Sequence, residues 1–159
     1  MVNNMKNVNK TKEKLERIFS DLDIKFTYLD YFNDDDLNYE LLISSTGVLK
    51  PLKTIRSICY YNFEDNTINI LVPNIYKIDN EDNIGSLYKI LNEANLHIVM
   101  GSFSIIENDI TKSKQIVYRT TYKCEENLDN FTKSSFEEQL ESLILNISYM
   151  FHLIKKDDE

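Results

Sequence analysis

Glycine, proline, cysteine and tryptophan are scarce in this chain of 159 residues, which holds three, two, two and none of them. Neither a phosphate-binding P-loop nor a dinucleotide fingerprint can be written with the three glycines, so we expect no nucleotide cofactor held by those motifs. Cys59 and Cys124 have no C-x-x-C partner. They therefore predict two reduced, buried or bystander thiols rather than a disulfide framework or a zinc site.

Residues that commonly carry catalysis are equally few. The two histidines, His97 and His152, have no second ligand at a metal-binding spacing, and neither H-E-x-x-H nor G-x-S-x-G occurs. We expect no catalytic, cofactor-binding or metal-binding residue, and the chain is interpreted as not being an enzyme. A pair of carboxylates working as acid and base stays open as an alternative, because sequence alone cannot show which carboxylates meet.

Long hydrophobic runs are also missing. The first residues, MVNNMKNVNKTKEKLERIF, contain no apolar stretch of a secretory signal, and no segment approaches a membrane-spanning helix. We therefore expect a cytoplasmic protein without a membrane partner. Lysine and arginine total 18 against 26 acidic residues, a net charge of −8, which disfavours nucleic acid because phosphate binding needs a surplus of basic side chains.

The chain does have enough apolar residues for one hydrophobic core. Hydrophobic residues make up 42% and aromatic residues 11% of it, and a chain of this length can bury a core without disulfides or a structural metal. We expect a disordered tail over residues 1–9, a single domain over 10–155 and an acidic tail over 156–159. From residue 10 to 22, apolar residues at helical spacing predict an amphipathic helix, namely Leu15, Ile18, Phe19 and Leu22.

Strand patterns follow this helix. Alternating apolar residues bounded by turn residues predict four strands, over 25–32, 39–44, 54–63 and 67–72. The segment EDN predicts a hairpin turn between the third and the fourth of them. Pro73 is expected to end the fourth strand. A helix capped by Asp79 or Asp82 should then reach Asn95, and a second hairpin should follow it over 97–106 and 114–123.

The last segment predicts a long helix. Ser135 and Glu138 have the spacing of a capping box, and an apolar stripe follows over about twenty residues, formed by Phe136, Leu140, Leu143, Ile144, Ile147, Phe151 and Ile154. The element order is α-β-β-β-β-α-β-β-α. It predicts an α+β fold, a single domain in which the helices gather on one face of an antiparallel sheet.

Surplus aromatic and apolar residues indicate where a partner could bind. Tyr60, Tyr118 and Tyr122 lie on predicted strands, and neighbouring strand residues point to opposite faces, so some rings should lie on the face that no helix covers. Their role is either an ordinary outer sheet face or a surface for an extended peptide or a second subunit. A second stripe on the last helix completes the candidate partner-binding set, with Leu145, Tyr149 and His152.

The second half of the chain resembles the YbjN family of small bacterial proteins. The run LYKILNEANLHIVMGSFSI, then QIVYRTTY, then the long helix carry the likeness, through the sequence positions Asn92, Asn95, Gly101, Phe103, Tyr118 and Arg119. The family is described as candidate regulators of sensory transduction. The resemblance implies the fold of type III secretion chaperone-like proteins and transfers no catalytic residue. The hydrophilic segment ENDITKSK is longer than the family's usual turn.

Two functions follow as expectations. The first is a non-enzymatic, chaperone-like binding or regulatory protein, a homodimer that holds a peptide or protein partner on an exposed sheet or helix surface. The alternative is an acidic inhibitor, similar to an immunity protein, that blocks a basic protein and is steered to it by charge. The two differ in the salt dependence of partner binding, since an apolar surface keeps its partner at high salt.

Overall fold

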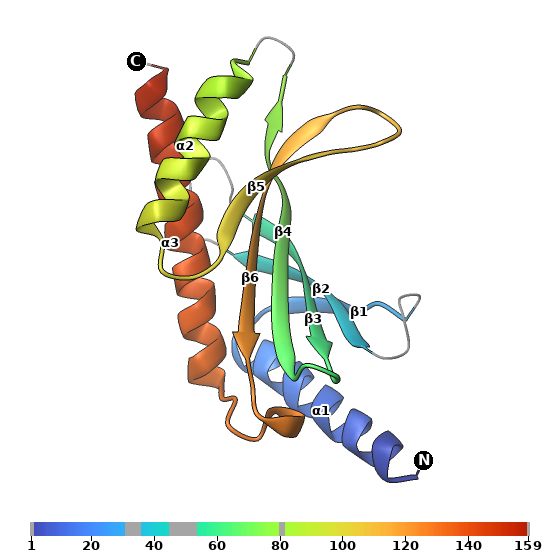
Figure 1. The fold of residues 1–159 in the computed structure, drawn as a ribbon. Helices are drawn as coiled ribbons and strands as arrows, with labels where there is room; N and C mark the ends of the chain where they lie inside the picture. Colours follow the sequence, from blue (N-terminus) through green and yellow to red (C-terminus); the bar gives the residue numbers. More distant parts are fainter. Residues whose placement is uncertain (1, 31–35, 45–53, 80–81, 159) are drawn as a thin grey trace.

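The computed structural model describes residues 2–30, 36–44, 54–79 and 82–158. Three long helices, one short 3-10 helix and six strands follow one another in these residues (Figure 1). Their bounds are α1 (Val2–Asp21), β1 (Lys25–Tyr28), β2 (Asp36–Ser44), β3 (Thr54–Asn62), β4 (Thr67–Ile78), α2 (Ile84–His97), β5 (Ser102–Glu107), β6 (Lys114–Lys123), η1 (Glu126–Leu128) and α3 (Lys133–Asp157). The strands form one antiparallel sheet in the order β1-β2-β3-β4-β6-β5. The predicted α+β class and element order are confirmed.

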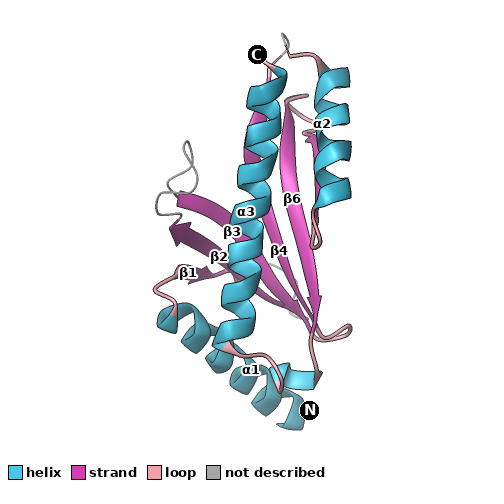
Figure 2. Ribbon diagram, turned by 90° about the vertical axis from the view of Figure 1, so that its left-hand side faces the viewer, coloured by secondary structure: helices cyan, strands magenta, loops and turns pink. Residues whose placement is uncertain are grey.

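The helices lie on one face of the sheet. Figure 2 shows α3 running along the sheet, with α2 beside its C-terminal half and α1 crossing near its N-terminal end. Burial in β2 alternates accordingly. Tyr39, Leu41 and Ile43 are buried, whereas Leu42, which lies between the last two, is exposed. Such burial of apolar side chains, at about 25 cal/mol per Å², is the main stabilising contribution to the fold.

Aromatic rings join the first helix to the sheet and to the last helix. The ring of Phe19 in α1 lies 5.5 Å from Phe26, 5.2 Å from Tyr39 and 5.5 Å from Phe136. Tilted and edge-on ring pairs at such distances add to the burial of the rings. The predicted apolar stripe of α1 therefore packs where the sequence required a surface. The helix itself begins at Val2, so residues 2–9, which we expected to be a disordered tail, are helical.

Strand β4 continues through Pro73, so the prediction that this proline ends the strand was wrong. The register to β6 shifts between Val72 and Tyr76, which is the position of a β-bulge. Proline has no N–H to donate, and a bulge is one of the few places inside a sheet where it fits. Asn74 within the bulge has a φ of 53°, a left-handed conformation that asparagine adopts more readily than most residues.

The helix caps differ from those predicted. Asn83, not Asp79 or Asp82, caps α2, and its side chain accepts a hydrogen bond from the Ser86 N–H at 3.2 Å. Thr132 caps α3, and Ser135 is the third helical residue of the capping box rather than its first member. A capping box was therefore correctly expected, but one turn too late.

The second hairpin is shorter than predicted on one side. Strand β6 has the predicted bounds, but β5 begins at Ser102 because α2 continues through His97. The tip between β5 and β6 is organised by Asn108, whose side-chain oxygen accepts hydrogen bonds from the N–H groups of Ile110 and Thr111 at 2.9 and 3.0 Å. The long hydrophilic segment is thus a structured turn.

Candidate partner-binding surface

The connection between α2 and β5, residues 98–101, is held by the side chain of Asn95. Its amide nitrogen donates to the carbonyl of Phe103 at 3.0 Å, and its amide oxygen accepts from the N–H of Phe103 at 2.7 Å. The two bonds imitate a strand partner for the start of β5. Asn92, the other asparagine of the motif, is exposed.

Tyr118 anchors the same connection from below. Its hydroxyl donates to the carbonyl of Met100 at 2.8 Å, and the Asn146 amide nitrogen donates both to this carbonyl at 3.0 Å and to the Tyr118 hydroxyl at 3.1 Å. Burial raises the pKa of Tyr118, so its hydroxyl keeps the proton that it donates. β6, α3 and the connection are therefore fixed relative to one another.

Gly101 is required where the chain passes over this ring. It has a φ of 75°, and a Cβ at this position would lie 2.4 Å from the Tyr118 hydroxyl oxygen and 2.8 Å from the Arg119 carbonyl oxygen. Any other residue would combine a strained backbone with a collision. The motif residues Asn95, Gly101 and Tyr118 thus form one structural cluster.

Apolar side chains are exposed on this connection and on the two helices beside it. Val99 is 98% exposed, Leu96 at the end of α2 is 83% exposed, and Leu145 on α3 is 61% exposed. Asn146, which follows Leu145, bonds to the connection, and the rings of His97 and Tyr149 lie 6.2 Å apart at nearly right angles. We call Leu96, Val99, Leu145 and the His97–Tyr149 pair the α2–α3 surface.

The sequence had selected part of this surface. Leu145 and the half-buried Tyr149 belong to it, and His152 is exposed one turn further along α3. Val99 was missed because the run HIVMG was interpreted as the start of a strand, in which alternate residues would be buried. Leu96 was missed because it fell between this strand and a helix expected to end at Asn95. No local signal marks them, since α2 ends with an extended cap at Ile98, and the left-handed Gly101 lies three residues further along the chain.

Tyr118 and Tyr122 do not lie on an outer face, contrary to their selection as partner-binding residues. Tyr118 is fully buried and pairs in register with Val72 on the helix-covered side. Tyr122 is half-buried on the same side, with its ring 5.4 Å from that of Phe131. The register between β4 and β6 decides on which face of the sheet each tyrosine lies, and this register could not be predicted from the sequence.

Tyr60 does lie on the uncovered face, as expected from its buried neighbour Tyr61. It is half-buried between Asn38 and Asn69 in the register of β2 and β4. Asn69 accepts a hydrogen bond from the Thr121 hydroxyl at 2.8 Å. Hydrogen-bonded asparagines therefore flank Tyr60 on both sides, so its surroundings are polar rather than an apolar binding surface.

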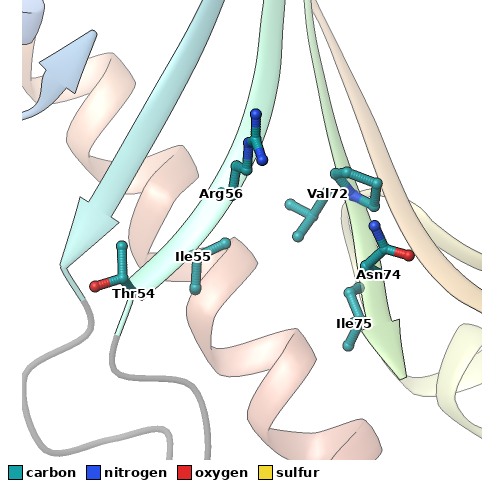
Figure 3. A pocket seen from close by; sticks show the side chains of 7 residues that line it. Thr54, Ile55, Arg56, Val72, Asn74 and Ile75 are labelled. Atoms are coloured by element: carbon teal, nitrogen blue, oxygen red, sulfur yellow. The ribbon is translucent and has the colours of Figure 1, made fainter. Parts of the chain in front are cut away.

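A small cavity lies between β3 and β4, where these strands separate (Figure 3). Its volume is about 130 Å³. Figure 3 shows Ile55 of β3 and Val72 of β4 directed toward each other across it. Its full lining consists of Thr54, Ile55 and Arg56 from β3 and Val72, Pro73, Asn74 and Ile75 from β4.

Other reactive groups are held in unreactive states. Burial raises the pKa of the Cys59 thiol to about 12 and that of Cys124 to about 11, so both are protonated and poor nucleophiles near neutral pH. In the part of the chain that the structure describes, no group of three or more histidine, cysteine, aspartate or glutamate side chains could hold a metal ion. No helix among the described residues combines the length and apolarity needed to cross a membrane.

Comparison with known proteins gives a fold but no family. No family model matches the chain, and no curated protein matches it. Among solved structures, it is similar to the crystal structure of YbjN from E. coli, described as a candidate transcription regulator. The TM-score is 0.54 at 13% identity, and the match covers 86% of this chain and 87% of the other. The chain therefore has a YbjN-like fold, as the sequence resemblance implied.

Proposed function

We propose that the chain is a non-enzymatic regulatory protein that works by binding proteins, and that two copies associate through the α2–α3 surface. One observation carries this: Val99, Leu96 and Leu145 are 98%, 83% and 61% exposed while the connection beneath them is fixed by hydrogen bonds. Apolar side chains held outward in a fixed position lose little entropy when a partner covers them.

The YbjN-like fold supports a regulatory role, because the similar structure is described as a candidate transcription regulator. A net charge of −8 opposes direct contact with DNA phosphates. Regulation by contact with another protein fits both facts. A second copy is the partner for this surface, since a twofold axis brings identical apolar patches together.

Light scattering coupled to size exclusion tests the association at high micromolar concentration. We expect a dimer for the native chain and a monomer for Val99→Lys and Leu145→Lys, because a lysine in the contact would be desolvated without a partner charge. Ile110→Lys is the matched control: Ile110 is 92% exposed, but it lies on the β5–β6 turn. A native chain that stays monomeric, or a dimer unaffected by both lysines, contradicts the proposal.

A further inference from the structure

β3 and β4 are neighbours in the sheet but pair over only part of their length. Their register extends from Ile58 opposite Leu71 to Asn62 opposite Thr67. Before Ile58, residues 54–57 of β3 pair with β2 on one side, and after the bulge residues 76–78 of β4 pair with β6 on one side. Within the described ranges, no strand pairs with the other edge of either segment. Among the described residues, each of these segments is therefore a strand edge paired on one side only, and the cavity lies where the two strands begin to separate.

The separation is built into the sequence of β4. Pro73 cannot donate a hydrogen bond to β3, and the N–H of Asn74 donates instead to the side-chain oxygen of Gln115 on β6, at 2.5 Å. The bulge thus turns β4 toward β6 and away from β3. This opening is a property of the native fold rather than frayed strand ends.

The cavity has an apolar base and a polar rim. Ile55, Val72 and Ile75 are 2%, 2% and 4% exposed, whereas Thr54 and Arg56 are exposed at the rim. A volume of about 130 Å³ is close to that of apolar cavities that bind a benzene-sized group. The site therefore has room for one aliphatic side chain.

Carboxylates gather where the free edge of β4 ends. Asp82 accepts hydrogen bonds from the Asp79 N–H at 2.7 Å and from the Tyr76 hydroxyl at 3.4 Å. Burial and the charges of Asp82, Asp158 and Asp79 raise the pKa of Tyr76. None of the three forms an ion pair among the described residues, although Lys77 lies two residues before Asp79. A basic side chain would be favoured here.

We propose that the opening between β3 and β4 binds an extended segment of another protein, which adds a strand to the free edge of β4, places an aliphatic side chain in the cavity and a lysine or arginine near Asp79. Unpaired strand edges select an extended backbone, and the cavity and the carboxylates select the side chains. From Ile75 to Asp79 is four residues, about 13 Å of strand, so the basic residue precedes the aliphatic one by about four positions in an antiparallel segment.

The inference rests on the proposed binding function for its context but uses a different surface. Loss of the dimer by Val99→Lys leaves the opening intact, and failure of peptide binding leaves the dimer test untouched. Either proposal can therefore fail alone.

Fluorescence anisotropy tests it with a labelled seven-residue peptide of threonine and valine that carries lysine at the second position and isoleucine at the sixth. We expect saturable binding that is at least about tenfold weaker when isoleucine is replaced by aspartate. Thr54→Trp should fill the rim and weaken binding similarly, whereas Thr27→Trp, an exposed residue on β1, should not. Asp79→Asn should weaken binding of the peptide with lysine at the second position but not of a peptide with threonine there. A general loss of folding would weaken both equally.

Amide hydrogen exchange locates the peptide. Binding should slow exchange in residues 54–57 and 76–78 and leave the edge strand β5 unchanged. Protection confined to β5, no binding at millimolar peptide, or equal effects of Thr54→Trp and Thr27→Trp would overturn the proposal. Concentration-dependent protection of 54–57 without peptide would also overturn it, because a second copy would then occupy the opening.

Discussion

Two regions of this protein differ in how their backbone polar groups are paired. Around the α2–β5 connection, Asn95, Asn146 and Tyr118 satisfy the backbone of Met100 and Phe103, and Gly101 stands where no side chain fits. Between β3 and β4, beside a proline, a bulge and a cavity, each strand has a segment that pairs on one side only within the described residues.

The difference bears on how much each region contributes to stability. Buried polar groups are usually paired, because leaving one unpaired costs about 1–3 kcal/mol. The hydrogen-bonded α2–β5 connection therefore contributes stability and holds the neighbouring α2–α3 surface in place. An open edge forgoes part of that stability and keeps its hydrogen-bonding groups available to another chain.

The largest effect is expected for Gly101→Ala. A Cβ 2.4 Å from the Tyr118 hydroxyl oxygen and a φ of 75° together should lower the free energy of unfolding by about 3 kcal/mol. Urea denaturation measures it. Gly85→Ala is the control: it lies in the first turn of α2, where its Cβ would lie 3.3 Å from the Asn83 side-chain oxygen that caps the helix, so we expect a change within about 1 kcal/mol. Equal effects at both glycines would mean that the chain at Gly101 is not packed tightly against Tyr118.

An intermediate effect is expected for Asn95→Ala. Removing the side chain leaves the N–H and the carbonyl of Phe103 without this partner and should cost about 2 kcal/mol. Asn92→Ala, on an exposed position of the same helix, should change stability by less than about 0.5 kcal/mol. If the two variants unfold at the same urea concentration, the hydrogen bonds between Asn95 and Phe103 contribute nothing to stability.

The smallest effect concerns the closed part of β3, two residues beyond the opening. Burial raises the pKa of Cys59 from 9.0 to about 12. Its contribution to stability is complete below about pH 9, where the thiol is protonated in both states, and is lost as the pH rises from about 9 to about 12, because only the unfolded chain ionises. The loss should reach about 1 kcal/mol by pH 10.

Urea titrations at pH 8, 9 and 10 on the native chain and on Cys59→Ala measure this loss. The variant should show a shallower decline with pH, although Cys124, with its pKa raised to about 11, keeps part of it. Identical declines would show that water reaches Cys59, and that the opening of β3 extends further along the strand than its pairing indicates.

The sequence predicted most of the fold because periodicity is local. The stripe of α3 and the alternation in β2 and β6 each depend on residues a few positions apart, and these elements were confirmed. Pro73 misled the prediction of β4, since a bulge that accepts a proline is formed with a second strand. Leu145, Tyr149 and His152 were placed on the surface by helix geometry alone.

By itself the sequence determined most of the helices and strands, the single core and the YbjN-like order of elements, because local spacing and apolar content decide these. Only the tertiary structure decided which face each tyrosine occupies, where β3 parts from β4, and that Leu96 and Val99 stay outside. The physical reason is that strand register and backbone hydrogen bonds join residues far apart in the chain. Tyr118 illustrates it: the ring that seemed available to a partner is the one that anchors the corner.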